Sequence, residues 1–139
     1  MESLIELLHT EKYSCVVSNG YETRIFTKQG VADLYGLMEN NPEFLKGSSV
    51  ADKVVGKAAA TLMIIGGVTH IYADLISESA ITLIKNTKAE LKYCKVVPFI
   101  KNRDKSDSCP LEKICNQTDS PQELLMLIGE FVKKMRKSY

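Results

Sequence analysis

A long and mostly apolar stretch, residues 49–65, limits what this chain can fold into. Its valines, alanines and large aliphatic side chains recur at the spacing of an α-helix. One stripe of that pattern consists of Val50, Val54, Ala58, Leu62 and Ile65. The opposite side carries small residues rather than charges, and a helix that is apolar around most of its circumference is buried. The pattern therefore predicts a buried helix from about residue 50 to residue 65, between a sheet and other helices.

The ends of this stretch carry the signals of a helix start and a helix stop. Ser49 and Asp52 form a variant of the capping box, with Ser49 as N-cap and the Asp52 carboxylate near the positive end of the helix dipole. Gly66 and Gly67 then end the helix, and residues 70–73 are typical of a strand.

The rest of the chain alternates between strand and helix patterns. Asn19-Gly20 between two β-rich runs predicts a hairpin, and residues 93–97 predict another strand. Helices are expected to begin near Ser77, Pro110 and Ser120. With no repeat and no linker, we expect one domain over residues 1–139: an α/β fold, built as a three-layer α/β/α sandwich with a mixed sheet.

Composition excludes several partners. The 18 basic and 17 acidic residues nearly balance, so there is no strong signal for nucleic acid. No apolar run approaches the roughly 18 residues that a membrane helix needs, and the acidic start does not resemble a signal peptide. The four cysteines form no CxxC pair, which favours reduced thiols and a cytoplasmic protein.

Four segments together resemble a small, uncharacterised prokaryotic family with a cytidine-deaminase-like fold. They are residues 51–60, the Tyr72 to Glu78 segment, Val97-Pro98 with Asn102-Arg103, and Cys109-Pro110-Leu111-Glu112. The resemblance runs from the first helix to Cys115. It implies a cytidine-deaminase-like domain, but it carries over no activity, because the family itself has none established.

The deaminase zinc motif is absent from the positions where the resemblance would place it. Deaminases have His-x-Glu or Cys-x-Glu at the start of the buried helix and Pro-Cys-x-x-Cys at the start of the next one. This chain has Asp52-Lys53 and Ser77-Glu78 there, and Cys109-Pro110 comes one strand later. Because a catalytic zinc takes three protein ligands, we expect no metal and no other cofactor.

Three polar residues of the apolar stretch are candidates for a site. Asp52 is either a site residue in place of the metal motif or simply a helix-capping carboxylate. Lys53 and Lys57 would lie one helical turn apart, where they could bind an anionic group beside the helix start. The alternative is that they form the solvated edge of the helix, an interpretation that suits Lys53 better than Lys57.

A second group of candidates follows the last strand. Cys109 precedes a helix-initiating proline, so its thiol would face free backbone N–H groups, with Glu112 as a neighbouring acid. The alternative for Cys109 is a small buried thiol. Asn102 and Arg103 follow a strand end, where α/β sheets bind ligands, and Arg103 is either an anion clamp or a loop charge.

Two functions are compatible with these residues, and the sequence does not decide between them. The first is a zinc-independent protein that binds or processes a small anionic or nucleotide-like ligand. Its site would combine Asp52, Lys57, Glu78, Arg103, Cys109 and Glu112. The second is a non-catalytic module that keeps a degenerate deaminase scaffold to bind a ligand or to form a homodimer. Whether the chain is an enzyme is left open by both.

The missing zinc motif gives a first prediction. Purified protein is expected to contain no stoichiometric zinc, because the positions that would hold the ligands carry Asp52-Lys53 and Ser77-Glu78. Elemental analysis of the purified chain measures this directly. One zinc per chain that disappears in Cys109→Ser would show that the ligands lie elsewhere in the sequence.

Overall fold

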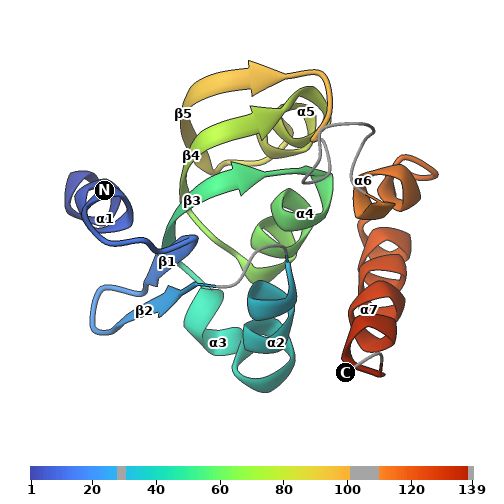
Figure 1. Cartoon of the computed structure of the whole chain (residues 1–139), viewed down its shortest axis with the longest axis horizontal. Helices are drawn as coiled ribbons and strands as arrows, with labels where there is room; N and C mark the ends of the chain where they lie inside the picture. The colour runs from blue at the N-terminus through green and yellow to red at the C-terminus, as the bar shows by residue number, and fades with distance from the viewer. Residues whose placement is uncertain (28–30, 101–109, 138–139) are drawn as a thin grey trace.

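The computed structural model describes residues 1–27, 31–100 and 110–137 (Figure 1). Twelve elements are described, and they alternate between helix and strand along much of the chain. In order they are α1 (Glu2–Thr10), β1 (Cys15–Ser18), β2 (Thr23–Phe26), α2 (Ala32–Asn40), α3 (Pro42–Leu45), β3 (Ser49–Val55), α4 (Lys57–Gly66), β4 (His70–Ser77), α5 (Glu78–Lys85), β5 (Glu90–Val97), α6 (Pro110–Cys115) and α7 (Pro121–Lys137). Within the described ranges, no helix has both the length and the apolar character that crossing a membrane requires.

The five described strands form one mixed sheet in the order β2-β1-β3-β4-β5. β1 is antiparallel to both of its neighbours, whereas β3, β4 and β5 are parallel. The predicted hairpin is confirmed as β1–β2. Its turn needs Gly20, whose φ is 94°, and the Asn19 side-chain oxygen accepts hydrogen bonds from the N–H groups of Tyr21 and Glu22.

The single helix expected over residues 50–65 is wrong in its first half. Residues 49–55 form β3, which lies between β1 and β4, and the helix begins only at Lys57. A strand buried on both faces shows a continuous apolar run rather than alternation, so its pattern can pass for that of a buried helix. Ser49 and Asp52 therefore do not cap a helix; Gly56 is the N-cap of α4.

The second half of that prediction is confirmed. Residues 57–63 of α4 are all buried, and the helix ends at Gly67, which adopts a left-handed conformation with φ of 86°. The three other predicted helix starts also agree with the sequence, and α7 begins at Pro121 directly after Ser120. Ser77 caps α5 by accepting a hydrogen bond from the Ala80 N–H at 3.2 Å, and α6 begins at Pro110.

Helices cover both faces of the sheet. Neighbouring residues on a strand point to opposite faces, and β1, β3 and β4 accordingly contribute to two cores. On one face α1 packs on β1 and β3, and the buried residues there are Leu4, Leu8, Val16, Ala51 and Tyr72. The larger core on the opposite face includes Val17, Val50 and Ile71 from the sheet, together with residues of α2, α4, α5, α6 and α7. The expected mixed α/β sheet is thus present, with helices on both sides (Figure 1).

Candidate functional site

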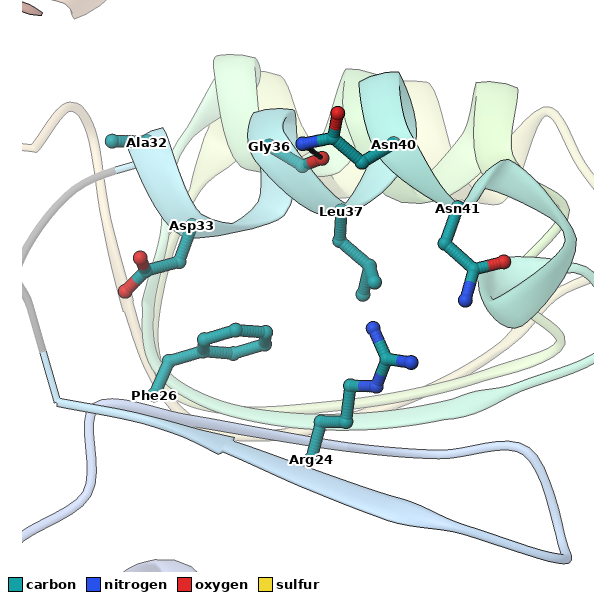
Figure 2. A pocket seen from close by; sticks show the side chains of 8 residues that line it. All are labelled: Arg24, Phe26, Ala32, Asp33, Gly36, Leu37, Asn40 and Asn41. Carbon is teal, nitrogen blue, oxygen red and sulfur yellow. Dashed lines mark hydrogen bonds between the residues drawn. The ribbon is translucent and has the colours of Figure 1, made fainter.

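A cavity of about 300 Å³ lies between β2 and α2 (Figure 2). Arg24 and Phe26 point into it from β2, because residues two apart on a strand share a face. Its eight lining residues are Arg24, Phe26, Ala32, Asp33, Gly36, Leu37, Asn40 and Asn41. We call this space the β2–α2 cavity. Its volume is at the lower end of the range of small-molecule pockets.

Arg24 is held in place on two sides. Its Nε donates a hydrogen bond to the Glu22 carboxylate at 3.0 Å, and its Cζ lies 4.4 Å from the centre of the buried Phe44 ring. These contacts leave the two terminal nitrogens of the guanidinium group, which Figure 2 shows directed toward Leu37 and Asn41. The cavity therefore has a fixed, fork-shaped hydrogen-bond donor at this end.

The other end of the cavity carries a carboxylate. Asp33 lies in the first turn of α2, and Figure 2 shows its side chain beside Phe26, away from Arg24. Asp33 is half-buried, and no ion pair joins it to a cation in the described part of the chain. The amide nitrogen of Asn40 is already used, because it donates to the Gly36 carbonyl at 3.0 Å.

A row of side chains connects the cavity to the centre of the sheet. Strand pairing places Phe26 of β2 opposite Cys15 of β1, and Cys15 opposite Asp52 of β3. Burial raises the pKa of Asp52 from 3.8 to about 7, although hydrogen bonds from the Val54 N–H, the Cys15 thiol and the Lys53 N–H favour the ionised form. Burial and then the Asp52 charge raise the pKa of Cys15 well above its usual value. A buried Asp–Cys pair thus lies beside the cavity, where perturbed ionisable groups favour a functional site.

Lys57, a predicted ligand-binding residue, has a structural contact instead. Its Nζ donates to the Thr118 carbonyl at 2.7 Å and to the Asp119 carboxylate at 2.6 Å. Lys57 is 4% exposed, so this ammonium fastens the segment before α7 to the first turn of α4. The expectation that Lys53 and Lys57 share one helix face is wrong, because Lys53 is in β3.

The predicted cluster as a whole is not assembled by the described residues. Asp52 precedes the Gly56 N-cap by four residues, or about 13 Å of strand, so it does not lie at the start of α4. Glu78 is the exposed first residue of α5. Asn102, Arg103 and Cys109 lie outside the described residues, as does the side chain of Glu112 in α6. Their predicted roles stay predictions.

The described residues also bear on metal binding. In residues 1–27, 31–100 and 110–137, no three or more His, Cys, Asp or Glu side chains are grouped so that they could hold a metal ion. Cys109 is not among those residues, so its part in the zinc prediction is tested only by elemental analysis.

Arg24 and Asp33 were missed by the sequence reasoning. A signal for Arg24 was present: it alternates with Phe26 on a hairpin strand, so a cation had to share a face with an aromatic residue that packs against the core. Nothing in the sequence pairs Asp33 with it, because the two residues come together only when α2 folds over β2.

Comparison with known proteins gives a family without a described activity. The family described as a domain of unknown function (DUF1893; TM1506) matches residues 3–132. The fold is similar to the crystal structure of a DUF1893 family protein (TM1506) from Thermotoga maritima, with 27% identity and a TM-score of 0.85. That match covers 93% of this chain and 87% of the other. No curated protein gives a significant match.

The raised pKa of Asp52 predicts a pH-dependent stability. Between its ordinary pKa of 3.8 and about 7 the unfolded chain loses the Asp52 proton while the native chain keeps it. Stability therefore falls as pH rises through this window, by about 4 kcal/mol for a shift of about three units. In Asp52→Asn this loss is absent, and an amide donor without a partner costs about 1–3 kcal/mol. The variant is expected to be the more stable protein at pH 8, by about 1–3 kcal/mol.

Urea denaturation at several pH values between 4 and 8 measures this difference. Glu6→Gln on the exposed side of α1 is the control, because it removes a carboxylate without affecting the buried pair. Parallel stability curves for wild type and Asp52→Asn would contradict the raised pKa of Asp52.

Proposed function

We propose that this chain, which belongs to the DUF1893 family of domains of unknown function, binds a small anionic ligand in the β2–α2 cavity. The observation that carries the proposal is the guanidinium of Arg24, held by Glu22 and Phe44 with its terminal nitrogens toward the cavity. A planar guanidinium matches the two oxygens of a carboxylate or phosphate group, and such paired hydrogen bonds are among the strong ones. Because Arg24 is already ordered, the ligand would not bear the entropic cost of ordering it.

The proposal is for binding rather than for a reaction. Asp52 is the described group that best suits proton transfer, since its pKa is about 7. It lies two strands from Phe26, however, or about 10 Å across the sheet, with Cys15 between them. A ligand in the cavity would therefore not reach the Asp52 carboxyl.

We also propose that the scaffold is cytidine-deaminase-like and works without catalytic zinc, in the cytoplasm. Support for the scaffold comes from the sheet order, in which a hairpin precedes three parallel strands, and from α4 and α5, which follow β3 and β4 directly. Support for the absence of zinc comes from the two helix starts, because α4 begins Lys57-Ala58-Ala59 and α5 begins Glu78-Ser79-Ala80, and neither carries the His and Cys ligands of the deaminase motif.

Anion binding is tested with variants of Arg24. Arg24→Gln removes the charge and the fork and is expected to weaken anion binding at least about tenfold. Arg24→Lys keeps the charge without the paired hydrogen bonds and is expected to bind with intermediate affinity. Isothermal titration with hexanoate, succinate, inorganic phosphate and adenosine monophosphate measures the effect. Lys85→Gln, which removes an exposed cation on α5, is the control.

Binding that is equal in wild type and Arg24→Gln would place the anion elsewhere. No binding of any of these anions by the wild-type chain would overturn the proposal.

A second function, a homodimer formed through β5, is favoured by a separate observation. β5 is the last strand of the sheet, and no described segment pairs with its outer edge. Most of its residues are exposed, including Tyr93 and Val96 at 42% and 39%. An open edge of this length is a template for another strand. In a two-fold dimer of antiparallel β5 strands, facing side chains lie on the same face of the sheet and so come from residues an even number apart; a register centred on Cys94 places Lys92 of each chain opposite Val96 of the other.

This register predicts opposite effects of two substitutions at Val96. Val96→Glu places a carboxylate opposite Lys92 of the other copy and is expected to strengthen the dimer. Val96→Lys places like charges there and is expected to weaken it. Light scattering after gel filtration measures the mass, and Lys85→Gln again serves as control. A wild-type chain that stays monomeric at all concentrations tested would contradict the dimer.

A further inference from the structure

We infer that the ligand of the β2–α2 cavity is an extended zwitterion: an aliphatic chain with a carboxylate at Arg24 and an ammonium group at Asp33. This inference rests on the proposed anion binding and adds the chemical class of the ligand. It follows from the charges at the two ends of the cavity, from their spacing, and from the surface between them.

The first argument is charge. Of the eight described residues that line the cavity, only Arg24 and Asp33 are charged, with one positive and one negative charge. A ligand with one charge of each sign therefore complements the cavity as a whole. A phosphate group that carries two negative charges would complement Arg24 but would be repelled by Asp33.

Asp33 also lacks the partner that a half-buried carboxylate normally has. Partial removal of a carboxylate from water is costly unless a cation or hydrogen-bond donors compensate it. In the described part of the chain Asp33 takes part in no ion pair and accepts no hydrogen bond through its side chain. An ammonium group on the ligand would supply both the charge and the donors. Asp33 is therefore a recognition group in this proposal, not a structural one.

The second argument is spacing. Asp33 lies in the first turn of α2, whereas the terminal nitrogens of Arg24 point to Leu37 and to Asn41, just past the end of that helix (Figure 2). Along the helix, Leu37 lies about 6 Å and Asn41 about 12 Å from Asp33, at about 1.5 Å per residue. The two charges of an α-amino acid sit on the same carbon and cannot span this length. The ligand therefore needs several bonds between its ammonium and its carboxylate.

The third argument is the surface between the charged ends. Phe26 lies on the β2 side of the cavity and Leu37 on the α2 side; Figure 2 shows the Phe26 ring between Asp33 and Arg24, and Leu37 over the Arg24 guanidinium. A chain of methylene groups can pack between these two apolar side chains. Together the three arguments favour an ω-amino carboxylate.

The closing experiment compares three probes of graded chemistry. 6-Aminohexanoate carries both charges at the ends of a methylene chain, hexanoate carries only the carboxylate, and glycine carries both charges on one carbon. Isothermal titration of the full chain is expected to give affinity for 6-aminohexanoate at least about tenfold higher than for hexanoate or glycine.

Asp33→Asn is the decisive variant. It removes the carboxylate that would pair with the ammonium group of the ligand. The affinity for 6-aminohexanoate is therefore expected to fall to that for hexanoate, and the affinity for hexanoate is expected to stay the same. Arg24→Gln is expected to lose its affinity for both 6-aminohexanoate and hexanoate, and Arg24→Lys is expected to keep part of its affinity for both. Glu43→Gln is the matched control, because it removes an exposed carboxylate on α3 outside the cavity lining. Thermal unfolding of each variant shows that it is folded.

The outcomes separate this inference from the proposal on which it rests. Equal affinity of wild type for hexanoate and 6-aminohexanoate, with both lost in Arg24→Gln, would overturn the zwitterion and leave the anion site intact. Glycine binding as tightly as 6-aminohexanoate would overturn the spacing argument. Failure of every probe and of every anion tested above would overturn the binding function itself.

Discussion

The structure depends on the burial of β3 between two neighbours of opposite direction. β3 pairs antiparallel with β1 and parallel with β4, and it thereby joins the hairpin to the parallel half of the sheet. Ala51 faces the small core under α1, whereas Val50 faces the larger core under the other helices. Residues 50–52 are buried on both faces of this strand, so a charge placed among them has no direct access to solvent. The two buried ionisable residues in or next to this strand, Asp52 and Lys57, are therefore forced into special arrangements.

Asp52 and Lys57 show the two ways in which a buried charge is accommodated. Asp52 has hydrogen-bond donors around it but no cation among its pKa determinants, so burial dominates and its carboxyl holds a proton up to about pH 7. Lys57 instead meets the Asp119 carboxylate at 2.6 Å and the Thr118 carbonyl at 2.7 Å, with an ammonium group that is hidden from solvent. Breaking such a pair leaves an uncompensated charge, and Lys57 is thereby committed to holding the segment before α7.

The sequence predicts those parts of the fold that depend on local chemistry. The Asn19-Gly20 turn, the Ser77 cap and the proline start of α6 are set by side chains acting on their own backbone, and all three are present in the structure. The β3–α4 boundary was missed because period and apolar content do not distinguish a doubly buried strand from a buried helix. Gly56 was the available signal, since glycine is unfavourable in a helix interior and acceptable at its N-cap. The β2–α2 cavity could not be predicted, because Arg24 and Asp33 come to line one cavity only through the tertiary packing of α2 over β2.

The different contacts of Lys57 and Arg24 explain why the proposed binding site lies at the hairpin side of the sheet. The expected position was the carboxyl end of the parallel strands, where the start of α4 offers N–H groups and Lys57 offers a cation. There the ammonium of Lys57 is already bound by Thr118 and Asp119, so an anion arriving at α4 would compete with an internal carboxylate. Arg24 differs because its internal contacts use only its Nε, which binds Glu22, and one face of its guanidinium plane, which stacks on Phe44. Its two terminal nitrogens still point into a cavity. Of these two cations, Arg24 is the one that the fold holds still and leaves available to a ligand.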